Sequence, residues 1–362
     1  MPRPVNAIDF WRGFALVTIF INHIPGLFYE KFTYRNVSLS DSAELFVFLA
    51  GWSLRHVVGK PEDPTPTHQL IFRLGGRALT IYAAHLTIVM LAIAMLAASA
   101  RILDNPLLLE WHNAAAVFYD PVDTHIGLVL LSHQLGYFDI LPLYVVLMLF
   151  APAIALVHRA APAWVVPLSL AIYFTALIFK ITVPTWPTEG QWFFNPLCWQ
   201  AVFVLGFAMS RERGPGGWVR ANIGWIRLAA LPIVIGAALL VLARWWPDPT
   251  RMPEPRLLFI NGKTFVTPMR LIQFLALVAV FSAVYPSIKR VLPRLVDYFS
   301  MLGRNSLQVF CAGSLLSLAG QIARFYFRAG IVVDTFIVLI GLVLLGVTAW
   351  MSEWRDRVQK PG

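Results

Sequence analysis

The chain has 362 residues, of which 58% are hydrophobic and only 13% are charged. Soluble globular proteins average about 45–50% apolar and about 25% charged residues, so this composition excludes an ordinary soluble protein and indicates one embedded in a lipid bilayer. The 29 Lys and Arg outnumber the 19 Asp and Glu, for a formal charge of +10. Membrane proteins carry such an excess in their cytoplasmic loops, so nucleic acid is not predicted as a partner.

Apolar stretches that approach the length of a membrane span occur along the whole chain. A transmembrane helix needs about 20 mainly apolar residues. The candidate stretches are 7–27, 41–58, 69–99, 140–158, 163–180, 197–211, 222–246, 268–288, 305–327 and 331–350. The predicted fold class is therefore all-α, a polytopic membrane helix bundle of about ten transmembrane helices. No soluble domain is visible, so residues 1–362 are predicted to form a single integral-membrane domain, with its catalytic helices within 7–99.

The distribution of basic residues predicts the orientation of this bundle. With the N-terminus inside, the inner loops and helix ends contain Arg55, Lys60, Arg73, Arg77, Arg159, Arg211, Arg213, Arg220, Arg227, Lys289, Arg290, Arg294, Arg355, Arg357 and Lys360. The outer loops are poorer in Lys and Arg and richer in acids. By the positive-inside rule both termini are predicted to be cytoplasmic.

The first predicted helix carries Arg12 and His23. Ionisable side chains are costly in hydrocarbon, so such residues are functional candidates by default. They are eleven residues apart, which is within about 20° of three full turns and about 16 Å along the helix axis. Arg12 and His23 therefore share one face, with Arg12 near the inner edge and His23 in the outer half.

The next two helices extend this arrangement into two polar layers. Glu44 lies about one turn into a helix that begins outside, near the depth of His23. On the third helix Arg73 and Arg77 share a face at the depth of Arg12, while His85 lies about 24 Å along the helix, level with the outer pair. The sequence thus predicts an inner layer of arginines and an outer layer of two histidines and a carboxylate.

These layers suit acyl transfer across a membrane. The planar guanidinium groups of arginine can form paired hydrogen bonds with the phosphates of coenzyme A. In the outer layer, His23 can take a proton from a hydroxyl that attacks a thioester, while Glu44 orients its ring. Three alternatives remain open. Arg73 and Arg77 could serve only as positive-inside anchors, His23 could be a core histidine bonded to a neighbouring carbonyl, and His85 could be a histidine that packs rather than reacts.

The outer connections are rich in aromatic residues. Trp192, Asn195 and Gln200 form either a sugar-binding platform or part of the interfacial aromatic belt. Arg270, less than one turn into its helix, is predicted to hold a glycan oxygen or a substrate carboxylate, or to extend to lipid headgroups. The sequence assigns no role to Lys263.

Several segments carry a family resemblance. IDFWRGFALVTIFINHIPG, from Ile8 to Gly26, resembles the first helix of the membrane acyltransferase-3 superfamily, in which a His follows an Arg-Gly pair, and AELFVFLAG resembles its second. Here Glu44 and Ala50 replace Asp and Ser, and Arg73 and Arg77 are four apart rather than three.

The OpgC branch of that superfamily is the more similar one. The segments that show this similarity are INHIPG (21–26), the pattern of Arg77, Tyr82 and His85, LPLYVVLMLFAP (141–152), WFFNPLCWQAVFVLG (192–206), KTFVTPMRLIQFLAL (263–277) and GRNSLQVF (303–310). The resemblance implies a catalytic His23, arginines that contact the acyl donor, succinyl-CoA as donor, and an osmoregulated periplasmic glucan as acceptor.

The sequence therefore predicts a multi-pass O-acyltransferase of the bacterial inner membrane, with the lipid bilayer, acyl-CoA and a glycan as partners. Acyl-CoA is a substrate, and no permanently bound cofactor or metal is predicted, since no histidine spacing such as HExxH occurs. The alternative is a membrane transporter or flippase for an anionic lipid-linked sugar or acyl group. All eight histidines lie within the first 158 residues, which favours one local reaction centre.

Overall fold

The structure is a computed structural model that describes residues 6–59, 64–246 and 248–358. Lys60 and Lys360, predicted above to lie inside, fall outside these described residues. Within them the chain is all-helical, and its extended pairings are two isolated bridges. The all-α prediction is therefore confirmed.

Each of the ten apolar stretches is helical. The corresponding elements are α1 (Ala7–Asn22), α2 (Ser42–Val58), α3 (Thr67–Ile102), α6 (Ile140–Ala160), α7 (Val165–Ile178), α8 (Pro196–Ser210), α10 (Ile223–Leu242), α11 (Pro268–Phe281) with α12 (Tyr285–Val291), α14 (Ser306–Tyr326) and α15 (Ile331–Val358). The helices outside those stretches are α4 (Ala115–Tyr119), α5 (Pro121–Val129), α9 (Pro215–Ala221) and α13 (Pro293–Arg304). Short 3-10 turns occupy Phe28–Phe32, Tyr34–Val37, Pro106–Asn113, Pro162–Trp164, Pro249–Arg251 and Arg256–Leu258.

Ten membrane crossings are not confirmed. Among the described residues five helices, α3, α6, α10, α14 and α15, are long and apolar enough to span, and the bent pair α11 and α12 adds a sixth candidate. Helices α1 and α2 have 16 and 17 residues. At 1.5 Å per residue they reach about 25 Å, short of a hydrocarbon core of about 30 Å. The number of crossings and the side of the termini remain predictions.

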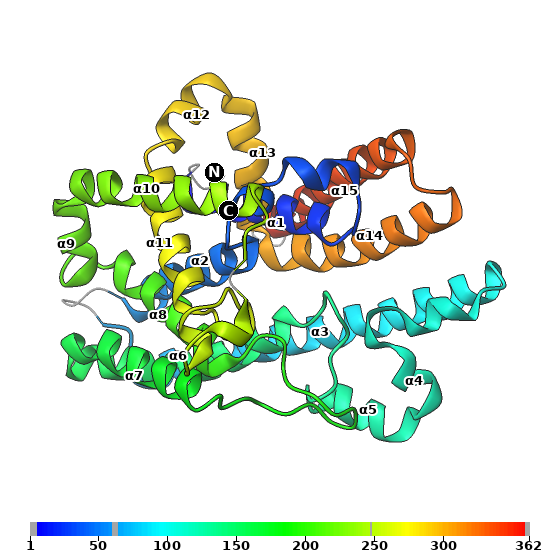
Figure 1. Cartoon of the computed structure of the whole chain (residues 1–362), viewed down its shortest axis with the longest axis horizontal. Coiled ribbons are helices and arrows are strands. Elements are labelled where there is room, and N and C mark those ends of the chain that lie inside the picture. The colour runs from blue at the N-terminus through cyan, green and yellow to red at the C-terminus, as the bar shows by residue number, and fades with distance from the viewer. Residues whose placement is uncertain (1–5, 60–63, 247, 359–362) are drawn as a thin grey trace.

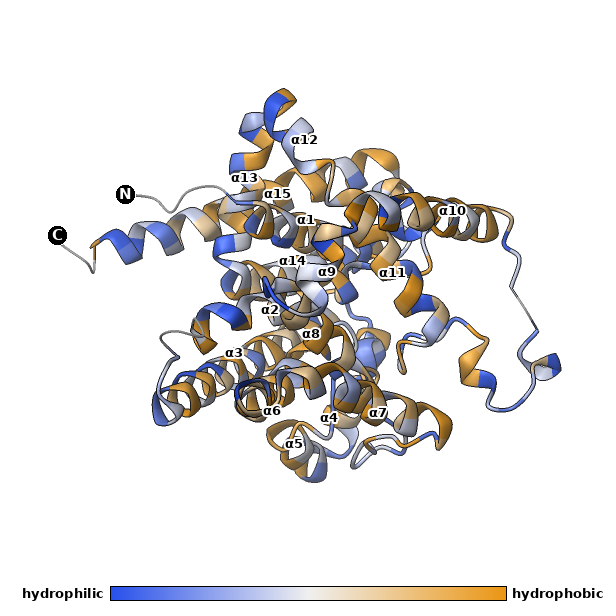
Figure 2. Ribbon diagram, turned by 90° about the vertical axis from the view of Figure 1, so that its left-hand side faces the viewer, coloured by the Kyte–Doolittle hydropathy of each residue, from blue (hydrophilic) through white to orange (hydrophobic). Residues whose placement is uncertain are grey.

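Helices α2 and α8 occupy the middle of the bundle. Figures 1 and 2 show them between a layer of α3, α6 and α7 and a second layer of α1, α13, α14 and α15. The two central helices meet at Gly51 and Gly206. A Cβ atom on Gly51 would lie 1.8 Å from the Phe203 carbonyl oxygen, and one on Gly206 would lie 2.0 Å from that of Phe48. Only glycine permits this approach, which fixes α2, the helix that carries Glu44.

Basic residues meet at one end of the bundle. Arg12, near the start of α1, donates to Ser53 near the end of α2. Arg55 at the end of α2 donates to the carbonyl of Ser210 at the end of α8, at 3.2 Å. We call this the basic end.

The first helix begins and the last helix ends at this basic end. A Cβ atom on Gly303 of α13 would lie 1.8 Å from the carbonyl oxygen of Asp9. The next residue, Arg304, forms an ion pair of 2.8 Å with Glu353 near the end of α15. Ala7 and Val358 therefore lie toward the same side of the molecule, as two termini in one compartment require.

Candidate active site

Glu44 is held at the start of α2, where a capping arrangement begins the helix. The Asp41 carboxylate accepts a hydrogen bond from the Ala43 N–H at 2.9 Å, and Glu44 accepts one from the Asp41 N–H at 3.0 Å. Such reciprocal bonds satisfy the free N–H groups of a helix start. The Glu44 side chain is completely buried, so its remaining oxygen needs an internal partner.

That partner is Arg270 on α11. Its Nε donates to Glu44, its Nη1 donates to the Leu39 carbonyl at 2.6 Å, and its Nη2 lies 3.1 Å from the Asp41 carboxylate. Lys263 completes the group with its Nζ 2.6 Å from the same carboxylate of Asp41. Two acids and two cations therefore form one network, in which Glu44 and Arg270 are buried and Asp41 and Lys263 are partly exposed. We call this network the outer ion cluster.

The outer ion cluster corrects the expected pairing of Glu44 with His23. Both oxygens of Glu44 are bonded within the cluster, and the hydrogen bonds of the described residues include none between Glu44 and His23. A buried carboxylate pairs with a guanidinium because its charge is otherwise uncompensated. Arg270 also does not extend to headgroups, since it is 7% exposed. The catalytic role assigned to Glu44 remains a prediction.

His23 ends α1 and is held by its backbone. Its carbonyl accepts a hydrogen bond of 2.5 Å from Gln321 on α14. The ring packs on Tyr137 with centroids 4.7 Å apart. Its Nδ1 is buried and lacks a hydrogen-bond partner among the described residues, so Nε2 is the nitrogen left for a substrate.

A second histidine, which sequence reasoning missed, lies beside His23. His112 also packs on Tyr137, with ring centroids 5.2 Å apart, and its Nε2 lies 2.8 Å from Gln321 Oε1. Gln321 therefore links His112 to the carbonyl of His23. No helical spacing signals His112, because it sits in a 3-10 turn with φ of 57°.

The outer ion cluster acts on His23 through space. The charged groups with an electrostatic effect on the ring are those of Lys263, Asp41 and Arg35, together with His112. His23 therefore lies near Lys263 and Asp41 of the outer ion cluster, although His23 and Glu44 form no direct bond among the described residues.

The guanidinium of Arg12 reaches deeper into the bundle than its backbone does. Arg12 donates to the Leu49 carbonyl at 3.0 Å and to Ser53. Leu49 is five residues beyond Glu44, about 7.5 Å along α2. The Arg12 guanidinium thus reaches the middle of α2 rather than the inner edge, because its long side chain extends into the bundle.

Tyr144 on α6 joins this inner group. The charges of Arg12 and Arg77 both act on its phenol. Its hydroxyl is buried and has no hydrogen-bond partner in the described part of the chain. Two cations and an unpaired hydroxyl are suited to an anion or a polarised carbonyl oxygen. The composition of LPLYVVLMLFAP gave no sign of this role.

The structure does not bring Arg73 and His85 into these groups. Arg73 is exposed and forms no hydrogen bond or ion pair with other described residues. His85 is fully buried on α3, and neither ring nitrogen has a partner within the described ranges. This burial agrees with the alternative that His85 packs within the bundle. Their assignments to donor and substrate remain predictions.

The expected sugar platform is largely internal. Asn195 is fully buried and caps α8, with its amide nitrogen 2.7 Å from the carbonyl of Ile181. Gln200 donates to the Ser169 carbonyl at 2.8 Å, and Trp192 is 7% exposed. None of the three presents an open sugar-binding surface here, so their substrate role remains a prediction. Lys263, which also lies over the rings of Phe193 and Phe194, is more accessible.

A large basic cavity opens at the basic end. Its volume is about 1230 Å³, and Glu212 is the only carboxylate among its described lining residues. The basic residues that line it are Arg55, His56, His158, Arg159, Arg211 and Arg213. The charge of Arg12 acts on His56, so this cavity lies close to the inner arginines. Guanidinium groups in this number suit phosphates.

Apolar helices long enough to span a bilayer, with polar side chains buried among them, define a membrane protein. Among the described residues no group of three or more His, Cys, Asp or Glu side chains is arranged to hold a metal ion. The chain matches the family model described as OpgC protein over residues 4–357 and therefore belongs to the OpgC family. This confirms the resemblance and indicates an acyltransferase-type enzyme that modifies glucans. No curated protein and no solved structure gives a significant match.

Proposed function

We propose that this protein is a membrane O-acyltransferase that moves a succinyl group from cytoplasmic succinyl-CoA to a hydroxyl of a periplasmic or cell-surface glycan. The observation that best supports this proposal is the position of His23. Its Nδ1 is buried, so its Nε2 is available to a substrate, and the ring lies near Lys263 and Asp41 of the outer ion cluster. The donor and the acyl group rest on the family resemblance.

The donor binds from the basic end. Arg12 and the buried Tyr144 hydroxyl offer hydrogen-bond donors within the bundle, and the exposed Arg77 lies close enough for its charge to act on that hydroxyl. The basic cavity beside them offers further guanidinium groups for the phosphates. This end faces the cytoplasm in the proposal, because cytoplasmic loops are the basic ones, and the membrane is the bacterial inner membrane.

His23 is the general base. Its Nε2 takes the proton of a glycan hydroxyl, and the oxygen attacks the thioester carbonyl. The new C–O bond forms, the C–S bond breaks, and the imidazolium returns its proton to the departing thiolate. Burial of the His23 ring, together with the charges around it, then sets the balance between its neutral and protonated forms.

The outer ion cluster positions the reaction site. The Arg270 side chain is 8% exposed and already faces the carboxylates of Glu44 and Asp41, whereas the Lys263 side chain is 28% exposed. Lys263 is therefore the cation better placed to meet a glycan oxygen or the free carboxylate of a succinyl group. Arg270 instead holds Glu44, Asp41 and the Leu39 carbonyl together.

The test uses purified protein in sealed vesicles, with succinyl-CoA added on one side and periplasmic glucan on the other. We expect glucan of increased mass, bearing ester-linked succinyl groups, together with release of free coenzyme A. Protein-free vesicles are the control. A transporter or flippase would move its cargo without releasing coenzyme A, and unmodified glucan in the presence of active, folded protein would refute the proposal.

A further inference from the structure

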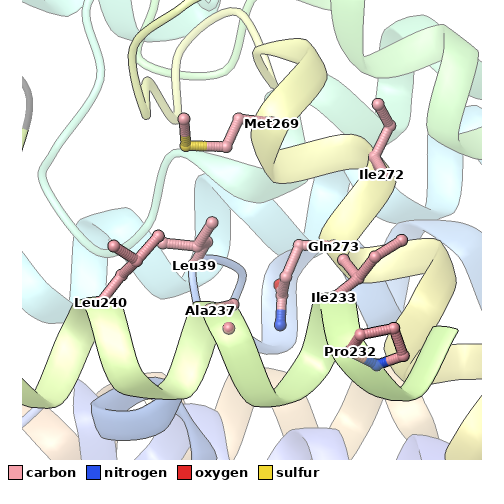
Figure 3. A pocket seen from close by; sticks show the side chains of 9 residues that line it. Leu39, Pro232, Ile233, Ala237, Leu240, Met269, Ile272 and Gln273 are labelled. Carbon is pink, nitrogen blue, oxygen red and sulfur yellow. The ribbon is translucent and has the colours of Figure 1, made fainter.

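A groove of about 280 Å³ lies between α10 and α11. It is also lined by Leu39, whose carbonyl accepts a hydrogen bond from Arg270 of the outer ion cluster. Figure 3 shows that its walls are apolar side chains, among them Ile233 and Ala237 of α10 and Ile272 of α11. Only 11% of the apolar 18-residue stretch of α10 is buried within the protein. In a membrane this groove would therefore open toward lipid.

One polar side chain, Gln273, lines the groove. Its Oε1 accepts hydrogen bonds from the Ser38 hydroxyl at 3.1 Å, the Ser40 hydroxyl at 2.8 Å and the Ser40 N–H at 3.2 Å. A backbone N–H can only donate, so the Ser40 bond fixes which end of the amide is oxygen. The amide nitrogen must then face away from the segment of Ser38 to Ser40.

The amide nitrogen of Gln273 has no partner. Gln273 is 1% exposed, and Nε2 makes no hydrogen bond to any described residue. Figure 3 shows this nitrogen extending toward α10. A buried donor without an acceptor is unfavourable and calls for a partner that the chain itself does not supply.

The walls decide what kind of partner fits. A buried water needs two to four polar neighbours, whereas the side chains around Gln273 in the groove are apolar. A hydrocarbon chain matches those walls, and an ester carbonyl supplies an acceptor without a donor. Gln273 is five residues into α11, about 7.5 Å from its start, so a lipid carbonyl can reach it from that end.

We propose that this groove binds an acyl chain of a glycerolipid, whose ester carbonyl accepts a hydrogen bond from Gln273 Nε2. By fixing Gln273, the bound lipid would also stabilise the segment from Ser38 to Ser40, which contacts the outer ion cluster. Gln273 holds Ser38 and Ser40, and between them the Leu39 carbonyl accepts a hydrogen bond from Arg270. This site is independent of the acyl donor and of the glycan.

The test places the full-length protein in phosphatidylethanolamine vesicles doped with a diacyl phosphatidylcholine that carries a photoreactive group in one chain. A matched probe has ether links in place of both esters and so lacks the carbonyls. We expect the ester probe to label the α10 peptide about twofold to tenfold more than the ether probe, the change that one neutral hydrogen bond makes. Equal labelling by both probes would overturn the proposed bond.

Two variants locate the site. Gln273→Leu should abolish the preference for the ester probe. Ala237→Trp, at a buried residue of the groove wall, is designed to fill the groove. When its unfolding midpoint shows that it is folded, it should abolish labelling by both probes. Ile235→Trp, at an α10 residue that is 56% exposed and outside the groove lining, is the control and should keep the preference. Undiminished labelling in Ala237→Trp would show ordinary surrounding lipid and contradict the proposal.

Discussion

Glu44 on α2 and Arg270 on α11 form a buried ion pair across 226 residues of sequence. The Glu44 side chain is 0% exposed and that of Arg270 is 8% exposed. Burial removes both charges from water, so each depends on the other for compensation. The pair therefore ties the start of α2, and with it Asp41, to the start of α11.

This ion pair makes a prediction about stability. Removing one partner of a buried pair typically costs about 3–5 kcal/mol, because the other charge is left uncompensated. Arg270→Gln should therefore lower the free energy of unfolding by about that amount, and adding Glu44→Gln should restore much of it. Unfolding in detergent measures both, in a double-mutant cycle. Additive losses in the double variant would show that the two residues act separately.

A second prediction separates the two arginines of α3. The charge of Arg77 acts on the phenol of Tyr144, whereas Arg73 has no hydrogen-bond or ion-pair partner among the described residues. A hydrogen bond to a charged group contributes about 1.5–3 kcal/mol. Arg77→Ala should thus weaken binding of coenzyme A thioesters about tenfold to hundredfold, more than Arg77→Lys does. Isothermal titration with a non-hydrolysable thioether analogue measures this.

Arg73→Ala is the matched control for that experiment. It removes the same charge one turn away, so its effect on donor affinity should be smaller than that of Arg77→Ala. Equal losses in the two variants would indicate general attraction of the anionic donor by positive charge rather than a contact with Arg77.

A third prediction concerns pH. Asp139 precedes α6, outside its apolar span, and burial raises the pKa of its carboxyl from 3.8 to about 7, against the opposing charge of Lys263. Between these values the folded protein holds a proton that the unfolded chain has lost, so this group makes the free energy of unfolding fall as pH rises. Above about pH 7 Asp139 has lost this proton in the folded protein as well, so its stabilising contribution to the free energy of unfolding is absent.

Asp139→Asn tests this dependence. Because the amide does not titrate, the variant should show a smaller fall in unfolding midpoint between about pH 5 and pH 8 than the parent protein. Thermal unfolding in detergent across that range gives the comparison. Parallel curves for parent and variant would mean that the pKa of Asp139 is not raised.

A fourth prediction addresses the contact between α2 and α8. Gly51→Ala would place a Cβ atom 1.8 Å from the Phe203 carbonyl oxygen, so the helices must separate. Overpacking typically costs about 1–3 kcal/mol, and a clash with backbone belongs at or above the upper end. Gly76→Ala on α3, where nothing lies within 4 Å, should be neutral or stabilising by up to about 1 kcal/mol. Unfolding midpoints of the two variants provide the test.

Hydropathy predicted the positions of the helices well, since each apolar stretch is helical. It missed α13 because that helix is amphipathic, with only residues such as Val296, Leu302 and Gly303 buried. Helix length was the weaker part of the prediction. The backbone of α1 ends at His23, before Gly26 takes a φ of +73°, and no apolar run marks that point.

Depth along the helices compared the levels of Arg12, His23 and Glu44 but could not reveal their contacts. The partner of Glu44 is Arg270, on a helix whose position relative to α2 no spacing can reveal. The Arg12 side chain reaches Leu49 because it is long, which a calculation from backbone rise ignores. Tyr144 and His112 carried no signal, since a single tyrosine in an apolar helix or a histidine in a turn usually only packs.

The central claim is that His23 is the base of an acyl transfer, and His23→Ala tests it most directly. The variant and the parent protein should be compared in the vesicle assay by the mass of the glucan, after unfolding midpoints show that both are folded. Loss of a positioned general base typically lowers the rate about 10²- to 10⁴-fold. The account predicts glucan with almost no added acyl groups, and near-normal acylation by a folded His23→Ala variant would contradict it.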